Sequence, residues 1–316
     1  MERVFIWQEF SMSHFQLIVL LGATGSGKSD LAVDLAIKLG NAVVVGCDSQ
    51  QVYQGSYLGT GKVSGEWLKV RIGTKFAPQF NKIFWYREIP HFLIDYVLPK
   101  EQYNVARFQQ DFSTLIHQLQ SLATPPTTII LTGGTGYYAE AILKGTIFPE
   151  VSTPSQLLPW QLRSLYIQKA LKTGRILNNS DFLNPRKLQK FTGERLHFDG
   201  LLPELQLGGV FALTLSKVEL QERIYKRILL RLESGMEQEF NEFWHKYQGS
   251  TSNGIEYKAM AFEKLGMLKE DEIIPLIYQQ TIQYAKRQIT WLKRMDYHSV
   301  QNLEQVMTLL HLPKKD

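Results

Sequence analysis

The chain has 316 residues, of which 44% are apolar, so it can bury one or two hydrophobic cores and is not expected to be disordered. Its 35 Lys and Arg residues against 30 Asp and Glu residues give a net charge of +5. This mild excess permits an anionic partner and excludes a histone-like protein. The single cysteine, Cys47, excludes an internal disulfide and a zinc site of several thiolates, which favours a reducing compartment such as the cytoplasm.

The N-terminal region lacks the features of a targeting segment. Glu2, Arg3, Gln8 and Glu9 interrupt its apolar residues, so we expect no secretory signal. No run in the chain approaches the roughly 20 apolar residues that span a bilayer, and we expect no membrane association. The first eleven residues show no periodic pattern, and our hypothesis is that Met12 is the physiological start.

Apolar, strand-like runs alternate with helical patterns in the first half of the chain. Such runs occupy residues 17–22, 42–45 and 127–131, and another lies at 210–215. Apolar residues at helical spacing follow the first run, from 31 to 39. Fully apolar strands that alternate with helices are typical of a parallel sheet covered on both faces. We therefore predict an α/β fold with a mostly parallel sheet and helices on both faces.

The pattern changes between residues 149 and 208, where prolines are frequent and short helical patterns occur, for example at 160–171. We predict a small helical insertion there. The core is expected to comprise 12–148 and 209–316, and its C-terminal part to be helical at 217–232, 238–247 and 273–295.

Residues 22–29 read GATGSGKS and fit the phosphate-loop pattern G-x-x-x-x-G-K-[ST], after a strand and before a helix. Glycines let backbone N–H groups surround phosphate oxygens, while a lysine neutralises charge and a serine can contact Mg²⁺. The sheet is therefore expected to be of the P-loop type, and a kinase, an NTPase and a transferase all remain open. The predicted diphosphate-binding residues are Gly22, Ala23, Thr24, Gly25, Ser26, Gly27, Lys28 and Ser29.

A second polar segment, DSQQVY at 48–53, follows the second strand-like run. Ligands on parallel sheets gather at the carboxyl ends of the strands, so this segment is expected to face the phosphate loop. Asp48 in such a place is a Mg²⁺ ligand, a general base or an ordinary strand-end cap. The residues alone leave these three interpretations open.

Five segments resemble, in order, the motifs of the tRNA dimethylallyltransferases, also called tRNA isopentenyltransferases. They are DSQQVY at 48–53, GTGK at 59–62, IPHFLID at 89–95, GGTGYY at 133–138 and TIQYAKRQITW at 281–291. Together with the phosphate loop they reach from about residue 17 to about residue 294. This ordered set is far more specific than the phosphate loop alone.

The resemblance implies that the phosphate loop holds the diphosphate of dimethylallyl diphosphate, with Ser29 at the Mg²⁺ ion. The N6 amine of adenosine 37 of tRNA would attack C1 of the prenyl group and release diphosphate. Asp48 is the family's base by position. A carboxylate within hydrogen-bond reach can orient this weakly basic amine and accept its proton.

The resemblance also implies which groups stabilise the leaving diphosphate. Thr135, in the GGTG segment, would donate to the bridging oxygen. Arg223, Arg227 and Arg231 are spaced four residues apart and share one helix face. Arg227 matches the position of the family's diphosphate-binding arginine, with Arg223 as the second candidate. An arginine suits this role because a planar guanidinium can hold two phosphate oxygens.

The expected RNA contacts lie mainly in the last motif. Lys286 and Lys293 are seven residues apart, as are Arg287 and Arg294, with Trp291 between them, which suits phosphate contact and base stacking. The target adenine of the anticodon stem-loop must leave its stack to react. The expected tRNA-binding residues are Ser49, Gln50, Gln51, Arg186, Lys190, Lys286, Arg287, Gln288, Trp291 and Lys293.

The sequence departs from the family's pattern at three places that we connect with RNA binding, one of which is Ile282, where an arginine is common. The basic segment at 186–193 looks shortened, and the usual I-G-Y near the tRNA surface reads Ile255-Glu256-Tyr257. The glutamate adds a negative charge and a Cβ where glycine permits close approach. The residues implied in prenyl transfer are all present.

We therefore predict a monomeric, cytoplasmic tRNA dimethylallyltransferase that uses Mg²⁺. An enzyme that prenylates free adenine nucleotides is the nearest rival, but a small acceptor needs no long helical extension after the GGTG segment. A small-molecule kinase is the next, although no arginine-rich lid is evident. A catalytically silent RNA-binding protein is the third, and the intact candidate catalytic residues argue against it.

Overall fold

The computed structural model describes residues 14–70, 76, 79–147, 164, 167–168, 172, 196–197, 201–247 and 254–310. The chain divides into two compact units, residues 1–143 with 201–316, and residues 144–200. Several expectations lie outside the described residues: the helical pattern at 160–171 for the most part, the candidate RNA contacts Arg186 and Lys190, and the start at Met12. The helical character of the insertion stays a prediction. In the smaller unit, β7 (Thr146–Ile147) pairs antiparallel with β8 (Leu196–His197).

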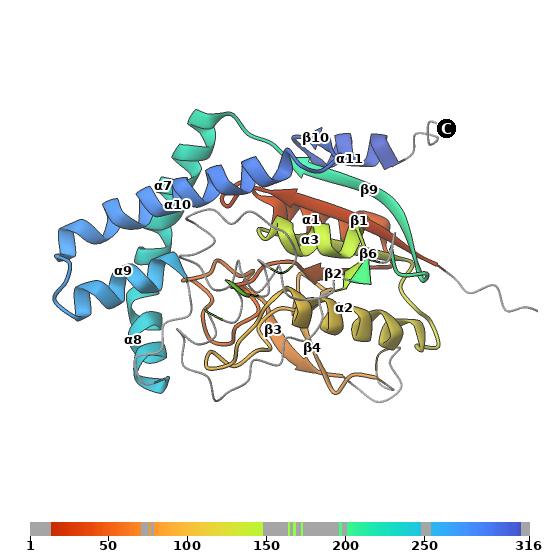
Figure 1. Cartoon of the computed structure of the whole chain (residues 1–316), viewed down its shortest axis with the longest axis horizontal. Helices are drawn as coiled ribbons and strands as arrows, with labels where there is room; N and C mark the ends of the chain where they lie inside the picture. The colour runs from red at the N-terminus through yellow and green to blue at the C-terminus, as the bar shows by residue number, and fades with distance from the viewer. Residues whose placement is uncertain are drawn as a thin grey trace, which may run out of the picture. The chain divides into compact units, whose positions relative to one another are not determined.

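The larger unit is built on one sheet, which has eight strands within the described residues, in the order β10-β9-β1-β6-β2-β5-β4-β3 (Figure 1). Neighbours from β10 to β5 pair in parallel, and β5-β4-β3 pair antiparallel. The mostly parallel sheet is thus confirmed. The strands are β1 (Phe15–Gly22), β2 (Ala42–Gly46), β3 (Glu66–Lys69), β4 (Lys82–Tyr86), β5 (Ile89–Phe92), β6 (Thr128–Gly133), β9 (Leu205–Leu213) and β10 (His298–Val300).

The helices of the larger unit include all of those predicted for the core. The patterns at 31–39, 217–232, 238–247 and 273–295 correspond to α1, α7, α8 and α10. The last of these begins earlier than predicted, with three acidic residues in its first turn, where the helix dipole favours negative charge. The helices are α1 (Lys28–Leu39), α2 (Val105–Gln120), α3 (Gly136–Leu143), α7 (Lys217–Glu233), α8 (Met236–Lys246), α9 (Ile255–Lys264), α10 (Glu270–Leu292) and α11 (Leu303–Leu310).

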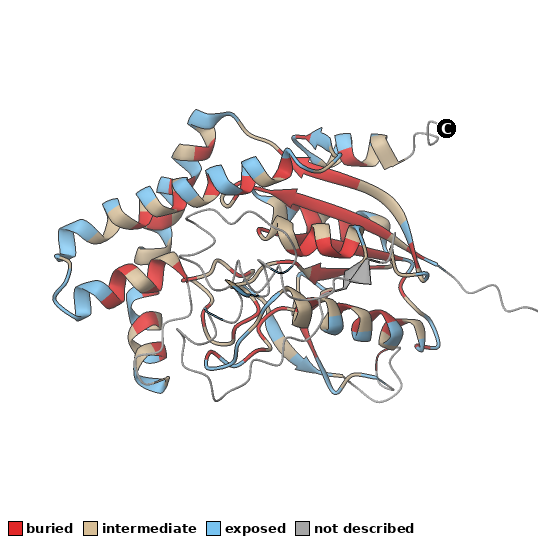
Figure 2. Ribbon diagram, in the orientation of Figure 1, coloured by how far each residue is buried: buried red, intermediate tan, exposed pale blue. Residues whose placement is uncertain are grey.

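Helices cover both faces of the sheet, as predicted, and this explains the continuously apolar strands. Side chains alternate between the two faces along a strand. On β1, Leu17, Val19 and Leu21 pack into a core shared with α2 and α3. Ile18 and Leu20 pack on the opposite face with α1 and α11. Figure 2 shows the central strands buried between these helices.

The loops after β1, β6 and β2 are neighbours because these strands lie side by side in parallel. The contact between the last two loops requires glycine. A Cβ on Gly133 would lie 2.0 Å from the carbonyl oxygen of Cys47. The backbone N–H of Thr135 donates to that same carbonyl oxygen at 3.1 Å. The GGTG segment is therefore held against the segment that carries Asp48.

A buried carboxylate, Asp95, organises the GTGK segment from one side. Its Oδ1 accepts from Lys62 Nζ at 2.7 Å and from the N–H of Gly55 at 3.2 Å. Its Oδ2 accepts from the Tyr57 hydroxyl at 2.7 Å and from Trp67 Nε1 at 2.9 Å. Burial lowers the pKa of Lys62, and the negative charge of Asp95 opposes that shift. Asp95 thus supplies the acceptor that the buried Lys62 needs, and we call this ion pair the anchor of the segment.

A second carboxylate, Glu239 of α8, holds the same segment from the other side. It accepts the backbone N–H groups of Tyr57, Leu58 and Gly59 at 2.9–3.0 Å and the hydroxyl of Tyr257 at 2.7 Å. Hydrogen bonds from several donors satisfy the oxygens of a carboxylate that is partly removed from water. The GTGK segment is consequently fixed between Asp95, which follows β5, and Glu239 of α8.

The alternation on β1 predicts how the core responds to truncation. Ile18 is fully buried, whereas Ile37 on α1 is 48% exposed. We expect Ile18→Ala to lower the free energy of unfolding by about 2–5 kcal/mol, because it removes buried methyl groups and leaves a cavity. Ile37→Ala, the matched control, should change it by less than about 0.5 kcal/mol. Urea denaturation of both variants measures the difference, and equal losses would contradict this account of the core.

The anchor role of Asp95 predicts a large effect of removing its charge. Asparagine keeps the size and tolerates the positive φ of 54° at this position. We expect Asp95→Asn to lower the free energy of unfolding by about 3–5 kcal/mol, because Lys62 stays buried without a counter-charge. The exposed pair of Asp34 with Arg87 gives the control, since Asp34→Asn should cost less than about 1 kcal/mol. Chemical denaturation distinguishes them, and a mild effect at Asp95 would refute the anchor.

Candidate active site

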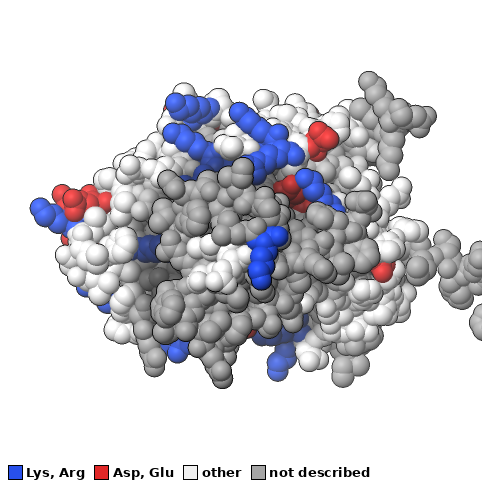
Figure 3. All heavy atoms as spheres, in the orientation of Figure 1, with Lys and Arg blue, Asp and Glu red and all other residues white. Residues whose placement is uncertain are grey.

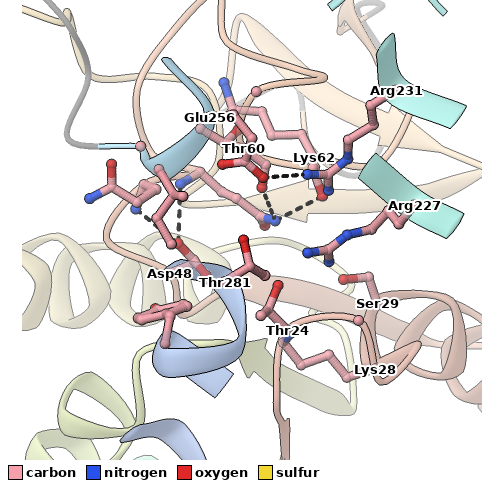
Figure 4. A pocket seen from close by; sticks show the side chains of 18 of the residues that line it. Thr24, Lys28, Ser29, Asp48, Thr60, Lys62, Arg227, Arg231, Glu256 and Thr281 are labelled. Atoms are coloured by element: carbon pink, nitrogen blue, oxygen red, sulfur yellow. Dashed lines mark hydrogen bonds and ion pairs between the residues drawn. The ribbon is translucent and has the colours of Figure 1, made fainter. Parts of the chain in front are cut away.

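A cavity of about 690 Å³ lies where the carboxyl ends of β1 and β2 meet α7, α9 and α10. The phosphate loop contributes Thr24, Gly25, Gly27, Lys28 and Ser29 to its lining. Ligand pockets commonly occupy about 300–1,000 Å³, so the space is adequate for a small substrate and part of a second one. Figure 4 shows Asp48 across the cavity from Lys28, Ser29 and Arg227.

The phosphate loop adopts the conformation that its glycines permit. Gly25 and Gly27 have φ angles of 83° and 94°, in the left-handed region that disfavours other residues. Helix α1 begins directly afterwards, at Lys28, so its N-terminus points at the loop. Burial lowers the pKa of Lys28 to about 8, although the nearby charge of Asp48 acts in the opposite direction. A diphosphate would supply the negative charge that this partly buried cation lacks.

The Asp48 carboxylate is fixed by backbone donors. Its Oδ1 accepts from the N–H of Gln50 at 2.9 Å and of Gln51 at 3.4 Å, and its Oδ2 accepts from the N–H of Gly134 at 3.2 Å. A carboxylate offers about four acceptor positions, so an N–H group inside the cavity can still be accepted. Asp48 is therefore held in an orientation that leaves it able to accept a proton from a group in the cavity. It faces the phosphate loop, as expected (Figure 4).

Thr135 lies directly behind Ser49, which lines the cavity. Among the described residues that line the cavity, Thr135 is absent. Its Oγ1 accepts from the backbone N–H of Ser49 at 3.0 Å and donates to Ser49 Oγ at 3.3 Å. These bonds tie the GGTG segment to the Asp48 segment. Donation from Thr135 to a substrate stays a prediction.

The arginine row of α7 lines the cavity, as its spacing predicts. Arg223 reaches the phosphate loop and donates to the carbonyl oxygen of Ser26 at 3.2 Å, while Glu219 also binds it at 2.9 Å. Arg227 projects into the cavity near Ser29 (Figure 4). Burial, followed by the neighbouring charge of Arg231, lowers the pKa of Arg227 to about 10. The Nε of Arg227 is buried without a hydrogen-bond partner. Arg227 is thus the better placed of the two predicted arginines for an anion.

The departure from the family's pattern at Glu256 lies inside the cavity. Glu256 is buried in the first turn of α9, and its Oε1 accepts from Arg231 Nη1 at 2.9 Å (Figure 4). A Cβ on Gly61 would overlap the Arg231 guanidinium, at 1.7 Å from Nη2. The ion pair therefore compensates the third arginine of the row. This arrangement connects Glu256 with the charge of the cavity, which sequence reasoning missed by considering only RNA contact.

The glutamines of the Asp48 segment also line the cavity. Gln51 Nε2 donates to the carbonyl oxygens of Thr60 and Gly61 at 3.3 and 2.9 Å, so it joins this segment to the GTGK segment. Gln50 has a buried Oε1 without a hydrogen-bond partner. Their expected contacts with tRNA stay predictions, and their positions in the lining are compatible with a nucleobase nearby.

Helix α10 presents its cations and its buried residues on different faces. Lys286, Arg287 and Lys293 are exposed, and Figure 3 shows Lys and Arg side chains grouped over the region where Figure 1 shows α7 and α10. Trp291 instead packs inward, with its ring 5.4 Å from that of Tyr137 and in contact with Gly136. The exposed cations suit RNA phosphates, whereas the position of Trp291 is that of a packing residue.

Tyr284 and Gln288 of α10 both line the cavity. Gln288 is only 7% exposed and bonds backbone atoms of two loops. Sequence reasoning missed Tyr284. Burial and the nearby charge of Asp48 raise the pKa of Tyr284, and its hydroxyl lies near Gly134. The four-residue spacing of Tyr284 and Gln288, on the face of Thr281, is the signal that would have found it.

The described part of the chain shows neither a membrane-spanning helix nor a cluster of metal-binding side chains. Helices there are too short or too polar to cross a lipid bilayer. Groups of three or more His, Cys, Asp or Glu side chains that could hold a metal are also lacking among these residues. A metal in this cavity would therefore depend on oxygen atoms other than a protein carboxylate cluster.

Similarity to known proteins agrees with the motifs. The profile of the IPP transferase family matches residues 51–295. A tRNA dimethylallyltransferase of Gloeothece citriformis is 31% identical over 88% of this chain and 88% of its own. The tRNA dimethylallyltransferase 1 of Geotalea daltonii is 30% identical over 90% of this chain and 88% of its own. The crystal structure of tRNA delta(2)-isopentenylpyrophosphate transferase from Staphylococcus epidermidis superimposes with a TM-score of 0.60 at 25% identity, over 93% of this chain and 96% of that one.

The family match includes the arginine row and α10, and the resemblance seen in the sequence is confirmed. The chain belongs to the IPP transferase family.

Proposed function

We propose that this chain transfers a dimethylallyl group from dimethylallyl diphosphate to N6 of adenosine 37 in the anticodon stem-loop of tRNA, releasing diphosphate. Its curated relatives are named tRNA dimethylallyltransferases. The observation that carries the proposal is one cavity lined both by a phosphate loop with its partly buried lysine, Lys28, and by an oriented carboxylate, Asp48. This combination suits an anionic leaving group on one side and proton removal on the other.

The donor would bind with its diphosphate at the phosphate loop. Lys28 and Arg227 are the buried or partly buried cations on that side, and Arg227 has an unpartnered N–H to offer. Charge that develops on the leaving oxygen is best stabilised by donors already in place, because they need no reorganisation during the reaction. Arg223, next to the loop backbone, would contribute less because it is exposed and already paired with Glu219.

The acceptor amine would lie between the donor carbon and Asp48. Its lone pair attacks C1 of the prenyl group, the C1–O bond breaks with its electrons leaving on diphosphate, and the proton on nitrogen passes to Asp48. The backbone N–H groups that hold Asp48 fix the direction of its remaining lone pairs. A base held this way requires the adenine to be everted from its stack, as for other enzymes that act on a base.

Magnesium fits the phosphate side of the cavity. In phosphate loops of this pattern the Ser or Thr hydroxyl contacts Mg²⁺, which also binds substrate phosphates and water. Ser29 lines the cavity next to Lys28 and would be that ligand. When bound, the ion would neutralise the diphosphate charge.

The tRNA would contact the exposed cations of α10, which lie on the same helix as the cavity residues Tyr284 and Gln288. Phosphate contacts of this kind weaken steeply with salt. We further propose that the chain acts as a monomer in the cytoplasm, a reducing compartment that fits its single cysteine, Cys47.

The decisive test is a product assay. The chain is incubated with dimethylallyl diphosphate, Mg²⁺ and either unmodified tRNA or AMP, and the products are identified by mass spectrometry. Prenylated adenosine from tRNA alone supports the proposal. Preferential use of AMP would favour a free-nucleotide prenyltransferase, and the absence of product from a folded preparation would favour a silent RNA-binding protein.

The base assignment predicts a specific loss in Asp48→Asn. The amide cannot take the proton, so we expect kcat to fall by about 10²–10⁴-fold. Binding of tRNA, measured by fluorescence anisotropy, should stay close to that of the unmodified protein. Asp34→Asn, in an exposed residue of α1, is the control with unchanged turnover. Near-normal turnover of Asp48→Asn would refute the role of the carboxylate.

The partly buried lysine predicts a pH dependence of donor binding. Because the pKa of Lys28 is about 8 in the free protein, its ammonium predominates below that pH and the neutral amine above it. We expect the affinity for dimethylallyl diphosphate to fall several-fold between about pH 7 and about pH 9, as the counter-charge is lost. Lys28→Met should bind weakly with a much flatter profile. Calorimetric titrations give both, and identical profiles would contradict the assignment.

A further inference from the structure

We propose that Gln288 is a positioning residue that sets the placement of the phosphate loop relative to the Asp48 base, a role distinct from contact with tRNA. The inference rests on the proposed function, because it concerns the relative placement of donor and base in that reaction. It is carried by a bridge between two loops that are far apart in sequence. The bridging side chain comes from a third element, α10.

The bridge consists of two short hydrogen bonds. Gln288 Oε1 accepts from the backbone N–H of Thr24 at 2.7 Å, and Gln288 Nε2 donates to the carbonyl oxygen of Gly134 at 2.7 Å. The amide of glutamine is neutral and carries both an acceptor and a donor, so this one side chain can make both hydrogen bonds. The side chain is buried, so water competes little for either bond.

The bridge continues to the base. The N–H of Gly134 donates to Asp48 Oδ2 at 3.2 Å, so the peptide groups around Gly134 bind Gln288 on one side and Asp48 on the other. The space is closely filled, because a Cβ on Gly134 would lie 2.5 Å from Gln288 Nε2 and 2.8 Å from Asp48 Oδ2. Movement of the Gln288 amide would thus be transmitted to the loop that orients the carboxylate.

The same geometry argues against a direct role in RNA binding. Both ends of the amide bond protein backbone, and the residue is only 7% exposed. The neighbouring cations Lys286 and Arg287 are exposed on the same helix and are available to phosphates. The two roles differ in kinetics, since loss of positioning lowers kcat whereas loss of an RNA contact raises the KM for tRNA.

The first experiment compares Gln288→Met with Gln283→Met. Methionine approximates the size of glutamine but makes neither hydrogen bond, and Gln283 is an exposed residue of the same helix. Small misplacements of reacting groups can cost about 100-fold in rate, so we expect kcat of Gln288→Met to fall by about 10- to 100-fold. The KM for tRNA should change little, and Gln283→Met should match the unmodified protein in both. A raised KM for tRNA with an unchanged kcat would overturn the proposal.

The second experiment uses Gln288→Glu, because only the protonated form of this glutamate can make both hydrogen bonds. If Gln288 only supported the fold, kcat would not follow this protonation. The ionised carboxylate keeps an acceptor for Thr24 but has no donor for the carbonyl of Gly134. The protonated form has both, and burial raises the pKa of a carboxyl group. The ratio of kcat between Gln288→Glu and the unmodified protein should therefore rise as pH is lowered from about 8 to about 6. A ratio that is constant over this range would overturn the proposal, even if Gln288→Met failed to fold.

Failure of the proposed function would be recognised separately. If the unmodified protein gives no prenylated tRNA, that function falls, and calorimetric binding of inorganic diphosphate then tests the bridge without any chemistry. Gln288→Met should bind diphosphate at least about tenfold more weakly, because Thr24 of the phosphate loop loses its partner. Equal binding would overturn the positioning role.

Discussion

The site depends on the parallel pairing of β1, β6 and β2, which places three loops at one edge of the sheet. Gly133 allows the chain after β6 to touch the backbone of Cys47, where a side chain could not be accommodated. Asp48 follows directly, and Gly134 donates to its carboxylate. The buried strands thus fix a carboxylate opposite a phosphate loop before any substrate binds, which is the kind of preorganisation that catalysis requires.

The charges around the cavity are compensated in a graded way. Arg231 has Glu256 as a close partner, Asp95 compensates the buried Lys62, and Arg227 retains an unpartnered N–H. A partly buried cation without full compensation is costly in the free protein, and the lowered pKa of Arg227 reflects this. An anion bound in the cavity would compensate the charge of Arg227, in keeping with a family whose substrates include a diphosphate.

Much of the fold followed from local pattern. The apolar runs at 17–22 and 42–45 and the helical spacing at 217–232 gave elements close to those found, because burial on both faces leaves a clear signature. Strands β3, β4 and β5 were not predicted, since short strands with mixed polarity carry a weak signal. Strand β9 begins at Leu205, so the larger unit resumes before residue 209.

The sequence by itself determined the phosphate loop, the Asp48 segment, the arginine row and the family, because each depends on residue types at fixed spacing. Only the tertiary structure decided which of these side chains share a cavity. It buried Gln288 between two loops, paired Glu256 with Arg231 and directed the Thr135 hydroxyl to Ser49. The physical reason is that hydrogen bonds between residues distant in sequence depend on how the elements pack, which no local pattern encodes.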